Sequence, residues 1–189
     1  MEALIVDDVL DEFVYGKLKT DKAAKIIPST KKLVTAARKA GVPVIYACDA
    51  HLPTDPEISL WGRHAMRGTS GARVVDDLKP TPADYVFEKR VYSSFQGTGL
   101  DLLLRNLRVD TVVIVGLYTD ICVRHTAADA FQRGYRIVIP SDCVEALQED
   151  NLTGIEYLRR IYNAKITSSP ELVEKWSRKE SKKKVVAVE

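Results

Sequence analysis

Short apolar runs rich in β-branched residues alternate along the chain with stretches of helical periodicity. The runs predict buried strands at Ala3–Asp7, Val42–Cys48, Tyr85–Glu88, Thr111–Val115, Arg136–Pro140 and Ala164–Thr167. The stretches between them predict helices over Ile26–Ala40, Gly99–Leu107, Ile121–Arg133, Asn151–Tyr162 and Pro170–Trp176. Repeated strand–helix–strand order predicts an α/β fold, with a mostly parallel sheet covered by helices on both faces.

The chain shows no internal repeat and no linker, so we assign residues 1–176 to a single domain. Arg178–Lys184 reads RKESKKK, and we interpret residues 177–189 as a basic, solvated C-terminal tail rather than a binding patch. Residues 49–82 contain prolines and glycines throughout and predict a long irregular loop. Loops of this length in compact domains usually carry function.

Composition narrows the class of protein. Hydrophobic residues make up 46% of the chain and charged residues 29%, with a net charge of +2, so nothing favours nucleic acid or a membrane as a partner. The three cysteines are an odd number without a disulfide pattern, which indicates a reducing compartment. The start, MEALIVDD, lacks the basic region of a signal sequence, and no window resembles a membrane span. We therefore expect a cytoplasmic protein.

Three residues with chemical potential follow predicted strands. Asp8 comes directly after the first strand, Lys89 after the third and Cys122 after the fourth. Ligands of open parallel sheets bind beyond the carboxyl ends of the strands. The pattern therefore predicts that the three side chains share one site.

Cys122 is the candidate nucleophile because it falls in the first turn of a predicted helix. Free N–H groups and the helix dipole are expected to lower the pKa of its thiol, and the same amides can hold an oxyanion. Thr119 or Asp120 can cap this helix. The alternative is that Cys122 is only a small buried residue. Cys48 and Cys143 lack this placement, and we expect them in the core.

A nucleophilic thiol needs a proton acceptor and a stabilising charge. Asp8 can accept the proton, and Lys89 can stabilise both a carboxylate and a thiolate. Taken singly, each has a plainer interpretation, because Asp8 can cap a turn and Lys89 can form a surface ion pair.

Three motifs in order resemble those of the isochorismatase-like cysteine hydrolases. Asp8–Phe13 (DVLDEF) resembles D-x-x-x-D-F, with Glu12 where the family usually has Asp. Lys89–Leu100 (KRVYSSFQGTGL) is similar to K-x-x-Y-S-x-F-x-G-T-x-L, and Gly116–Val123 (GLYTDICV) to G-x-x-T-D-x-C-V. The resemblance runs from residue 3 to about residue 167.

The resemblance implies a six-stranded sheet and a catalytic set of Asp8, Lys89 and Cys122. Asp8 would take the thiol proton, and Cys122 would form a thioester with an amide substrate. The family also has a cis peptide in the nucleophile turn, here Leu117–Tyr118, which would aim the Tyr118 and Cys122 amides at the oxyanion. Members commonly form dimers or tetramers, so a homo-oligomer is expected.

The long loop carries a possible metal site. Asp49 and His51 form a D-x-H pair, and His64 and Glu57 follow in the same loop. Imidazole and carboxylate ligands suit Zn²⁺, Fe²⁺ or Mn²⁺, with zinc the first candidate. The set resembles the nicotinamidase metal site, with Glu57 as a fourth ligand. The alternative is that Asp49 caps a turn and both histidines face solvent.

Nicotinamidases bind a flat ring, and Phe13, Trp61 and Tyr92 match positions that line the ring pocket in that branch; each can instead be core. His125 is expected to play a structural or supporting role. The resemblance thus implies a metal-assisted nicotinamidase acting on a small-molecule amide. The alternatives are a cysteine amidohydrolase for another amide or carbamoyl compound, and a non-enzymatic binding module. Isochorismate hydrolysis is disfavoured, because members with that activity generally lack the nucleophilic cysteine.

Overall fold

The computed structural model describes the chain from residue 1 to residue 186, with side chains through residue 178. In this part of the chain the strands are β1 (Glu2–Asp7), β2 (Val44–Asp49), β3 (Tyr85–Lys89), β4 (Thr111–Leu117), β5 (Arg136–Pro140), β6 (Val144–Glu145) and β7 (Lys165–Thr167). The α-helices are α1 (Asp11–Val14), α2 (Ile27–Ala40), α3 (Pro56–Trp61), α4 (Leu100–Asn106), α5 (Cys122–Gln132), α6 (Asn151–Tyr162) and α7 (Ser169–Val186). Short 3₁₀ turns occupy residues 23–26, 70–72, 76–78 and 141–143.

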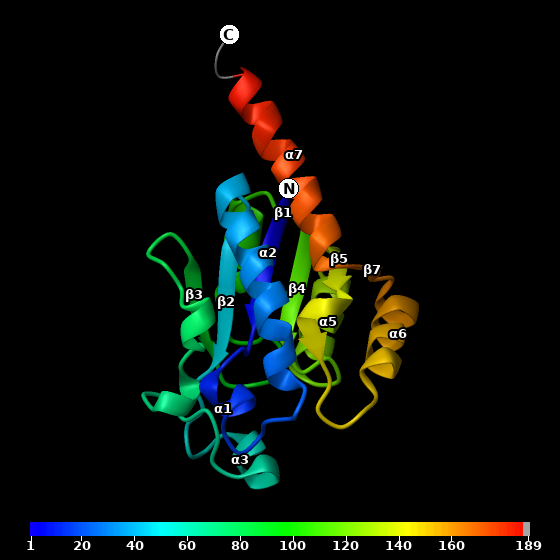
Figure 1. Ribbon diagram of the computed structural model, residues 1–189. Helices are drawn as coiled ribbons and strands as arrows, with labels where there is room; N and C mark the ends of the chain where they lie inside the picture. Colours follow the sequence, from blue (N-terminus) through cyan, green and yellow to red (C-terminus); the bar gives the residue numbers. More distant parts are fainter. Residues whose placement is uncertain (187–189) are drawn as a thin grey trace.

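The strands form one parallel sheet in the order β3-β2-β1-β4-β5-β7 (Figure 1). The two-residue β6 pairs with the end of β4. Asp7, the last residue of β1, stands level with Ala47 on β2 and Gly116 on β4. The carboxyl ends of the central strands therefore lie side by side at one end of the sheet.

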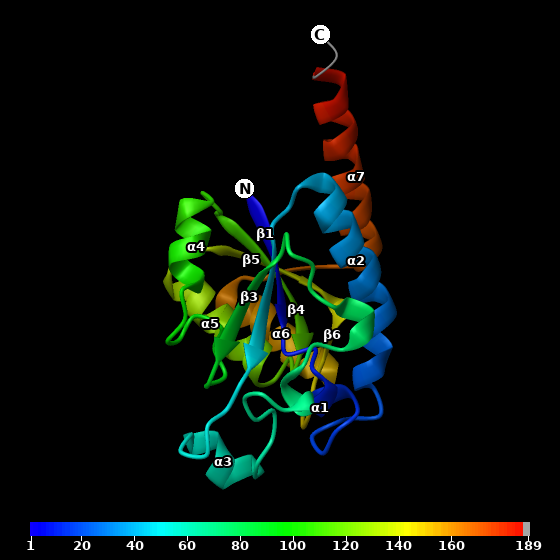
Figure 2. The same cartoon turned by 90° about the vertical axis from the view of Figure 1, so that its left-hand side faces the viewer.

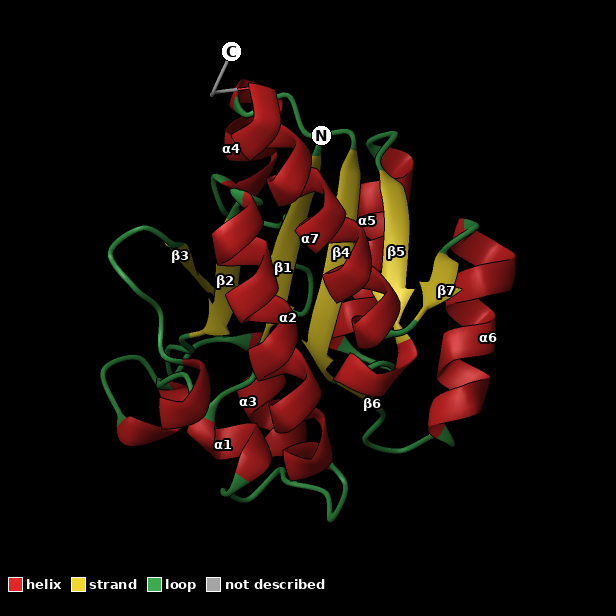
Figure 3. Ribbon diagram, turned by 45° about the horizontal axis from the view of Figure 1, so that its top comes forward, coloured by secondary structure: helices red, strands yellow, loops and turns green. Residues whose placement is uncertain are grey.

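Helices cover both faces of this sheet, and two apolar clusters fill the space between the layers. Leu4 and Val6 of β1 pack into the cluster beneath α2 and α7, while Ala3 and Ile5 pack into the cluster beneath α4, α5 and α6. Figure 2 shows α2 and α7 on one side of the strands and α4 and α5 on the other, and Figure 3 shows the same layers from above. Successive side chains of β1 therefore point alternately into the two apolar cores.

The predicted α/β architecture is confirmed, and all six predicted strands are present. The expectation of six strands is nevertheless too low, because β6 adds a seventh in the described part of the chain. Val144–Glu145 is too short to show a period of its own. The terminal helix, expected to end at Trp176, continues to Val186, and Glu174 supports this extension through an ion pair with Arg178 at 2.5 Å.

The loop over residues 49–82 is more regular than its prolines suggested, because it contains α3 and two 3₁₀ turns. Pro56 starts α3, in the position where a proline's missing N–H costs nothing. None of the helices in the described part of the chain is both long enough and apolar enough to cross a bilayer.

Gly116 allows β4 to lie directly beside β1 at the carboxyl edge. Its φ is +124°, and a Cβ atom there would lie 1.8 Å from the carbonyl oxygen of Asp7. Only glycine fits this contact. The close approach brings the segment after β4 next to the segment after β1, where Asp8 lies.

Candidate active site

Four strand ends supply the polar centre of the molecule. Asp8 follows β1 directly, Asp49 ends β2, Lys89 ends β3, and Cys122 begins α5 after β4. All four are buried, with Cys122 the most exposed at 6%. The structure therefore brings together the three residues that the strand pattern predicted to share a site.

Lys89 lies at the middle of this group. Its Nζ atom is 2.5 Å from Oδ2 of Asp8 and donates to Oδ1 of Asp49 at 2.6 Å. Asp7 contributes a third carboxylate, whose Oδ1 is 4.0 Å from the same nitrogen. One buried ammonium group thus faces three buried carboxylates.

This crowding sets the protonation of the cluster. Burial works against the charged form of Lys89, but Asp49 and Asp8 outweigh it and raise the pKa of the ammonium well above its usual range. Burial raises the pKa of Asp8 well above its usual range, and Asp49 adds to the rise. Burial likewise raises the pKa of Asp7 to about 6. For Asp49 the attraction of Lys89 outweighs burial, so its pKa is lowered.

The thiol of Cys122 differs from expectation. Its pKa is raised well above the usual range, because burial outweighs the attraction of Lys89, and Asp8 and Asp49 oppose ionisation. The helix dipole does not dominate here, so the resting group is a thiol that must lose its proton during reaction. One oxygen of Asp8, one of Asp49 and Sγ of Cys122 all lie within 4.8 Å of one another. A proton acceptor therefore lies next to the nucleophile.

The expected helix caps are also wrong. Ile121 precedes α5, and no side chain caps it. Asp120 instead accepts hydrogen bonds from the backbone amides of Leu147, Gln148 and Glu149, and Thr119 donates to Asn151 at 2.7 Å. These bonds tie the nucleophile turn to the segment before α6, which a local sequence pattern does not reveal.

The peptide bond between Leu117 and Tyr118 is cis, as the resemblance implied. The hydroxyl group of Tyr118 donates to the carbonyl oxygens of Phe13 at 2.7 Å and Leu18 at 2.5 Å. The nucleophile turn is therefore connected to the segment after β1. That connection holds Phe13 and Leu18 at the wall of the pocket in front of Cys122.

The predicted metal ligands form a second buried cluster beside the first. Asp49, His51, Glu57 and His64 each offer a ligand atom, and these atoms lie within 4.8 Å of one another. The alternative of solvent-facing histidines is excluded, because His51 is 1% and His64 3% exposed. Helix α3 brings Glu57 into the group, since Glu57 is the second residue of that helix.

The tautomers of His51 and His64 show whether their ring nitrogens are free to bind a cation in this cluster. Nδ1 of His64 lies 2.8 Å from the carbonyl oxygen of Gly62, and a carbonyl can only accept, so Nδ1 carries the proton. His51 likewise turns Nδ1 toward Asp55, which leaves its buried Nε2 without a hydrogen-bond partner in the described structure. Both rings thus turn Nε2 toward the carboxylates.

The electrostatics of the cluster also fit a divalent cation. Burial opposes the charge of His51, but hydrogen bonding and attraction from Asp49 outweigh it and raise its pKa to about 9. Burial and the nearby Asp49 raise the pKa of Glu57 to about 7. Both shifts show that the cluster favours bound positive charge, and its two imidazole nitrogens and two carboxylates form a donor set that suits Zn²⁺, Fe²⁺ or Mn²⁺.

A narrow cavity of about 20 Å³ connects the metal cluster with the nucleophile. The residues lining it are Phe13, Leu18, Asp49, Glu57, Trp61, His64, Tyr92, Leu117, Tyr118, Ile121, Cys122 and Leu147. The indole N–H of Trp61 donates to the hydroxyl oxygen of Tyr92 at 2.9 Å. None of these described lining residues is an arginine or a lysine. The cavity is thus mainly aromatic and apolar, with its polar groups near Cys122.

The remaining predicted residues lie outside this cavity. His125 is exposed, and its ring lies 5.0 Å from that of Tyr92. Cys48 and Cys143 are buried free thiols in the apolar core, as expected. Sequence reasoning missed Leu18, Ile121 and Leu147 as lining residues, because each lies in a segment whose position depends on long-range contacts.

Sequence reasoning also missed the support of the carboxylate cluster. Thr126 of α5 donates to Oδ2 of Asp7 at 2.7 Å and contacts the hydroxyl of Ser94 at 3.0 Å. Asp7 directly precedes Asp8. This pair of adjacent aspartates at the end of a strand is the one sequence signal that could have indicated a role for Asp7.

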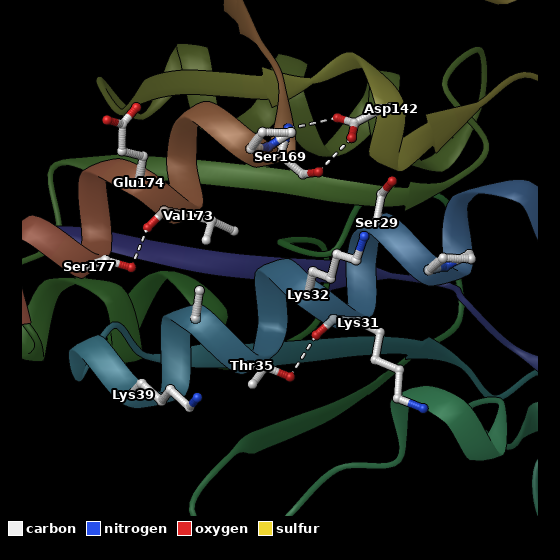
Figure 4. A pocket seen from close by; sticks show the side chains of 13 residues that line it. Ser29, Lys31, Lys32, Thr35, Lys39, Asp142, Ser169, Val173, Glu174 and Ser177 are labelled. Atoms are coloured by element: carbon white, nitrogen blue, oxygen red, sulfur yellow. Dashed lines mark hydrogen bonds between the residues drawn. The ribbon is translucent and has the colours of Figure 1, made fainter.

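A larger open groove of about 830 Å³ lies elsewhere, between α2 and the start of α7 (Figure 4). Lys31, Lys32 and Lys39 of α2 line one side, and Glu174 and Ser177 of α7 line the other. None of the predicted catalytic, metal-binding or ring-binding residues reaches it. The chemistry of the molecule is therefore concentrated in the narrow cavity at the sheet edge.

Comparison with known proteins places this arrangement among hydrolases. Residues 2–171 match the family model for the Isochorismatase domain. N-carbamoylsarcosine amidase from Thermoplasma acidophilum is 46% identical, with 89% of this chain and 96% of that chain covered and a TM-score of 0.86. Pyrazinamidase/nicotinamidase from Streptococcus mutans UA159 is 34% identical (88% and 100% covered, TM-score 0.83). Pyrazinamidase of Pyrococcus horikoshii, solved in complex with zinc, is 28% identical (88% and 98%, 0.82).

Proposed function

The chain belongs to the isochorismatase family as an amidohydrolase, and we propose that it is a metal-assisted nicotinamidase that converts nicotinamide to nicotinate and ammonia. The observation that carries the proposal is the shared cavity. Asp49, Glu57 and His64 of the metal cluster line the same narrow space as Cys122. A small ring amide bound in this space would face both groups.

The character of the walls supports a neutral aromatic substrate. Phe13, Trp61, Tyr92 and Tyr118 line the cavity. Aromatic walls bind a flat ring through packing and exclude water. No arginine or lysine among the described lining residues offers a partner for a free carboxylate. N-carbamoylsarcosine carries a carboxylate, whereas nicotinamide does not, so the lining favours nicotinamide.

The metal cluster gives the ring an orientation. Asp49, His51, Glu57 and His64 would hold a divalent ion, for which zinc is the first candidate. An ion held there would supply Lewis acidity toward a pyridine nitrogen. With the ring nitrogen directed toward this cluster, the carboxamide points at the nucleophile.

The chemistry at Cys122 follows from the protonation of the site. Asp8 takes the proton of the thiol as Sγ attacks the carbonyl carbon, with Lys89 holding the carboxylate in place. The backbone amides of Tyr118 and Cys122 are the proposed donors to the oxyanion. Asp8 then gives the proton to the leaving nitrogen, the C–N bond breaks, and ammonia departs from the thioester.

Hydrolysis of the thioester reverses these roles. Asp8 accepts a proton from water, the hydroxyl oxygen attacks the thioester carbonyl, and the C–S bond breaks. The proton returns to Sγ of Cys122, which restores the buried thiol, and the product leaves as nicotinic acid, which ionises to nicotinate in water. The raised pKa of Asp8 suits this shuttle, because it makes the ionised carboxylate a stronger base than an ordinary aspartate.

A second candidate is hydrolysis of a carbamoyl compound. It is favoured by the 46% identity to the N-carbamoylsarcosine amidase structure. In this case the same Asp8, Lys89 and Cys122 would act on a ureido carbonyl. A negatively charged substrate of this class would have to rely on the metal cluster for a cationic partner.

The test is ammonia release by purified protein from nicotinamide and, separately, from N-carbamoylsarcosine. Each is measured before and after stripping by a chelator and after return of Zn²⁺, Fe²⁺ or Mn²⁺. We expect turnover of nicotinamide that falls on stripping and returns with metal. Turnover of the carbamoyl compound alone would favour the second candidate. Cys122→Ala should abolish turnover, and Cys143→Ala, which alters a buried cysteine outside the cavity, is its matched control and should retain turnover.

A further inference from the structure

Asp55 lies directly behind His51, on the side away from the metal cluster. Its Oδ2 is 3.2 Å from Nδ1 of His51 and accepts a hydrogen bond from the backbone amide of Leu52 at 2.9 Å. The side chain of Asp55 is 2% exposed and that of His51 is fully buried. The proposed mechanism gives Asp55 no role.

This contact fixes which nitrogen of His51 faces the cluster. An ionised carboxylate only accepts hydrogen bonds, so the neutral imidazole must carry its proton on Nδ1. The lone pair is then on Nε2, which lies 3.4 Å from Oδ2 of Asp49 and 3.7 Å from Oε2 of Glu57. This Nε2 is buried and has no hydrogen-bond partner in the described structure.

Arg90 holds the carboxylate in this position. Its Nε donates to Oδ1 of Asp55 at 3.0 Å, and its Nη2 donates to the same oxygen. A two-pronged guanidinium contact fixes the plane of a carboxylate as well as its place. Arg90 directly follows Lys89, so the contact connects the end of β3 with the loop that carries His51.

Asp55 also determines where a second ligand lies. It is the residue before α3, and its backbone is extended where the helix begins. Glu57 is the second residue of that helix. A shift of Asp55 would therefore move the imidazole of His51 and the carboxylate of Glu57 together.

We propose that Asp55, clamped by Arg90, is a positioning residue of the metal centre that sets the tautomer and orientation of His51. Hydrogen-bonded carboxylates behind ligating histidines orient the ring and increase its basicity in many metal sites. The inference rests on the metal centre of the proposed function. It goes beyond that function because it assigns a role to two residues that touch neither the substrate nor the ion.

The first experiment compares zinc affinity, measured by competition with a chromophoric chelator, in the wild type and the variants Asp55→Ala, Asp55→Asn and Arg90→Gln. Loss of such a partner typically weakens metal binding by about 10–100-fold. We expect this loss in Asp55→Ala. Asp55→Asn keeps one acceptor oxygen and should fall between Asp55→Ala and the wild type. Glu88→Gln is the matched control. Glu88 lies on β3 close to Arg90 in sequence, but its carboxylate pairs with Arg67 at the surface. The zinc affinity of this variant should be unchanged.

The second experiment reads the tautomer without metal. Nitrogen-15 NMR of the metal-free protein at a pH where His51 is neutral should show the proton on Nδ1 in the wild type and a mixture in Asp55→Ala. Thermal unfolding of each metal-free variant verifies that it is folded, and Arg90→Gln gives a second route should Asp55→Ala fail to fold.

The outcomes separate the inference from the proposed function. A wild type that binds zinc tightly, with equal affinity in folded Asp55→Ala and Arg90→Gln, would overturn the positioning role and leave the metal centre intact. A wild type that binds none of the three metals would overturn the metal centre itself, and the positioning role with it. Weakened affinity together with a mixed tautomer in Asp55→Ala supports the inference.

Discussion

The ammonium nitrogen of Lys89 lies 2.5 Å from Oδ2 of Asp8, and neither side chain is exposed to solvent. This single cation stands against the carboxylates of Asp7, Asp8 and Asp49, whose Oδ atoms lie within 4.0 Å of it. An excess of buried negative charge makes proton uptake by a carboxylate favourable. The relationship therefore serves the proposed proton transfer and at the same time makes the fold depend on Lys89.

Replacing Lys89 by methionine should destabilise the protein strongly. The substitution keeps the length of the side chain but leaves the buried carboxylates without a counter-charge, which typically costs about 3–5 kcal/mol. The free energy of unfolding, from urea titration at pH 7, provides the measurement. Lys31→Met is the control, because Lys31 and Asp77 form an ion pair in which both side chains are more than half exposed; its effect should stay below about 1 kcal/mol. Equal effects in the two variants would contradict the proposed charge balance.

Replacing Asp8 by asparagine should lower kcat for amide hydrolysis by about 10²–10⁴-fold, with KM little changed, because a positioned proton acceptor is lost. Ammonia release under steady-state conditions measures both constants. Asp7→Asn is the matched control, since Asp7 directs its carboxylate toward Thr126 and Ser94. Its loss in kcat should be below about 10-fold, less than the usual contribution of a general base. A larger loss in Asp7→Asn than in Asp8→Asn would mean that Asp7, and not Asp8, carries the proton.

Removing the hydrogen bond between Trp61 and Tyr92 should raise KM. Trp61→Phe and Tyr92→Phe each delete one partner of the 2.9 Å contact at the cavity wall. A hydrogen bond of this kind contributes about 0.5–1.5 kcal/mol, so we expect KM to rise roughly 2–10-fold.

The double variant provides the sharper measurement. Because both changes delete the same bond, the double variant should show about the same KM as either single variant. Fully additive effects would mean that the two side chains act on the substrate independently. Tyr157→Phe, on the outer part of α6, is the control and should leave KM unchanged.

Gly116→Ala should prevent or severely weaken folding. The new Cβ atom would lie 1.8 Å from the carbonyl oxygen of Asp7, which is backbone and cannot move without separating β4 from β1. Gly68→Ala is the control, because Gly68 also has a positive φ, +77°, but open space around it. The control should lose only about 1 kcal/mol, the cost of the strained backbone. Soluble yield and thermal unfolding of the two variants test this; similar melting temperatures would show that the strands can separate there.

Stability should depend on pH through Asp84. Burial works against its charge, but the bond from Arg38 at 2.6 Å and the bonds from Thr81 outweigh burial and lower the pKa of Asp84 below its usual value. A folded-state pKa below the unfolded value of about 3.9 gives stability that is present above that pH. This contribution is lost as the pH falls through the folded-state value.

The measurement compares wild type and Asp84→Asn by urea unfolding at several pH values. The variant should be less stable by roughly 1.5–3 kcal/mol near pH 7, because hydrogen bonds to a charged group are lost. The difference should stay constant down to about pH 5 and shrink below about pH 4. A difference that grows as the pH falls would mean that folding raises the pKa of Asp84, which contradicts this prediction. Asp77→Asn, in the exposed pair with Lys31, should show little difference at any pH.

The sequence by itself determined where six strands lie along the chain and which residues follow them. Apolar runs of about five residues predicted six strands, and the parallel order placed Asp8, Lys89 and Cys122 at one edge. The D-x-H pair and the resemblance to the nicotinamidase metal site together pointed to Asp49, His51, Glu57 and His64, whose ligand atoms do lie together. The strand positions and the meeting of their carboxyl ends could be predicted because they depend on local periodicity and on the rule that the carboxyl ends of parallel strands lie together.

The tertiary structure decided the properties that depend on distant neighbours. Helix position alone predicted a lowered pKa for Cys122, whereas burial beside Asp8 and Asp49 raises it. The clamp of Asp55 by Arg90 joins residues 35 positions apart, and no local pattern marks it. Charge interactions and desolvation act through space between segments that meet only when the sheet forms. For this reason the sequence points to the candidate reacting groups, and only the folded chain sets their protonation and orientation.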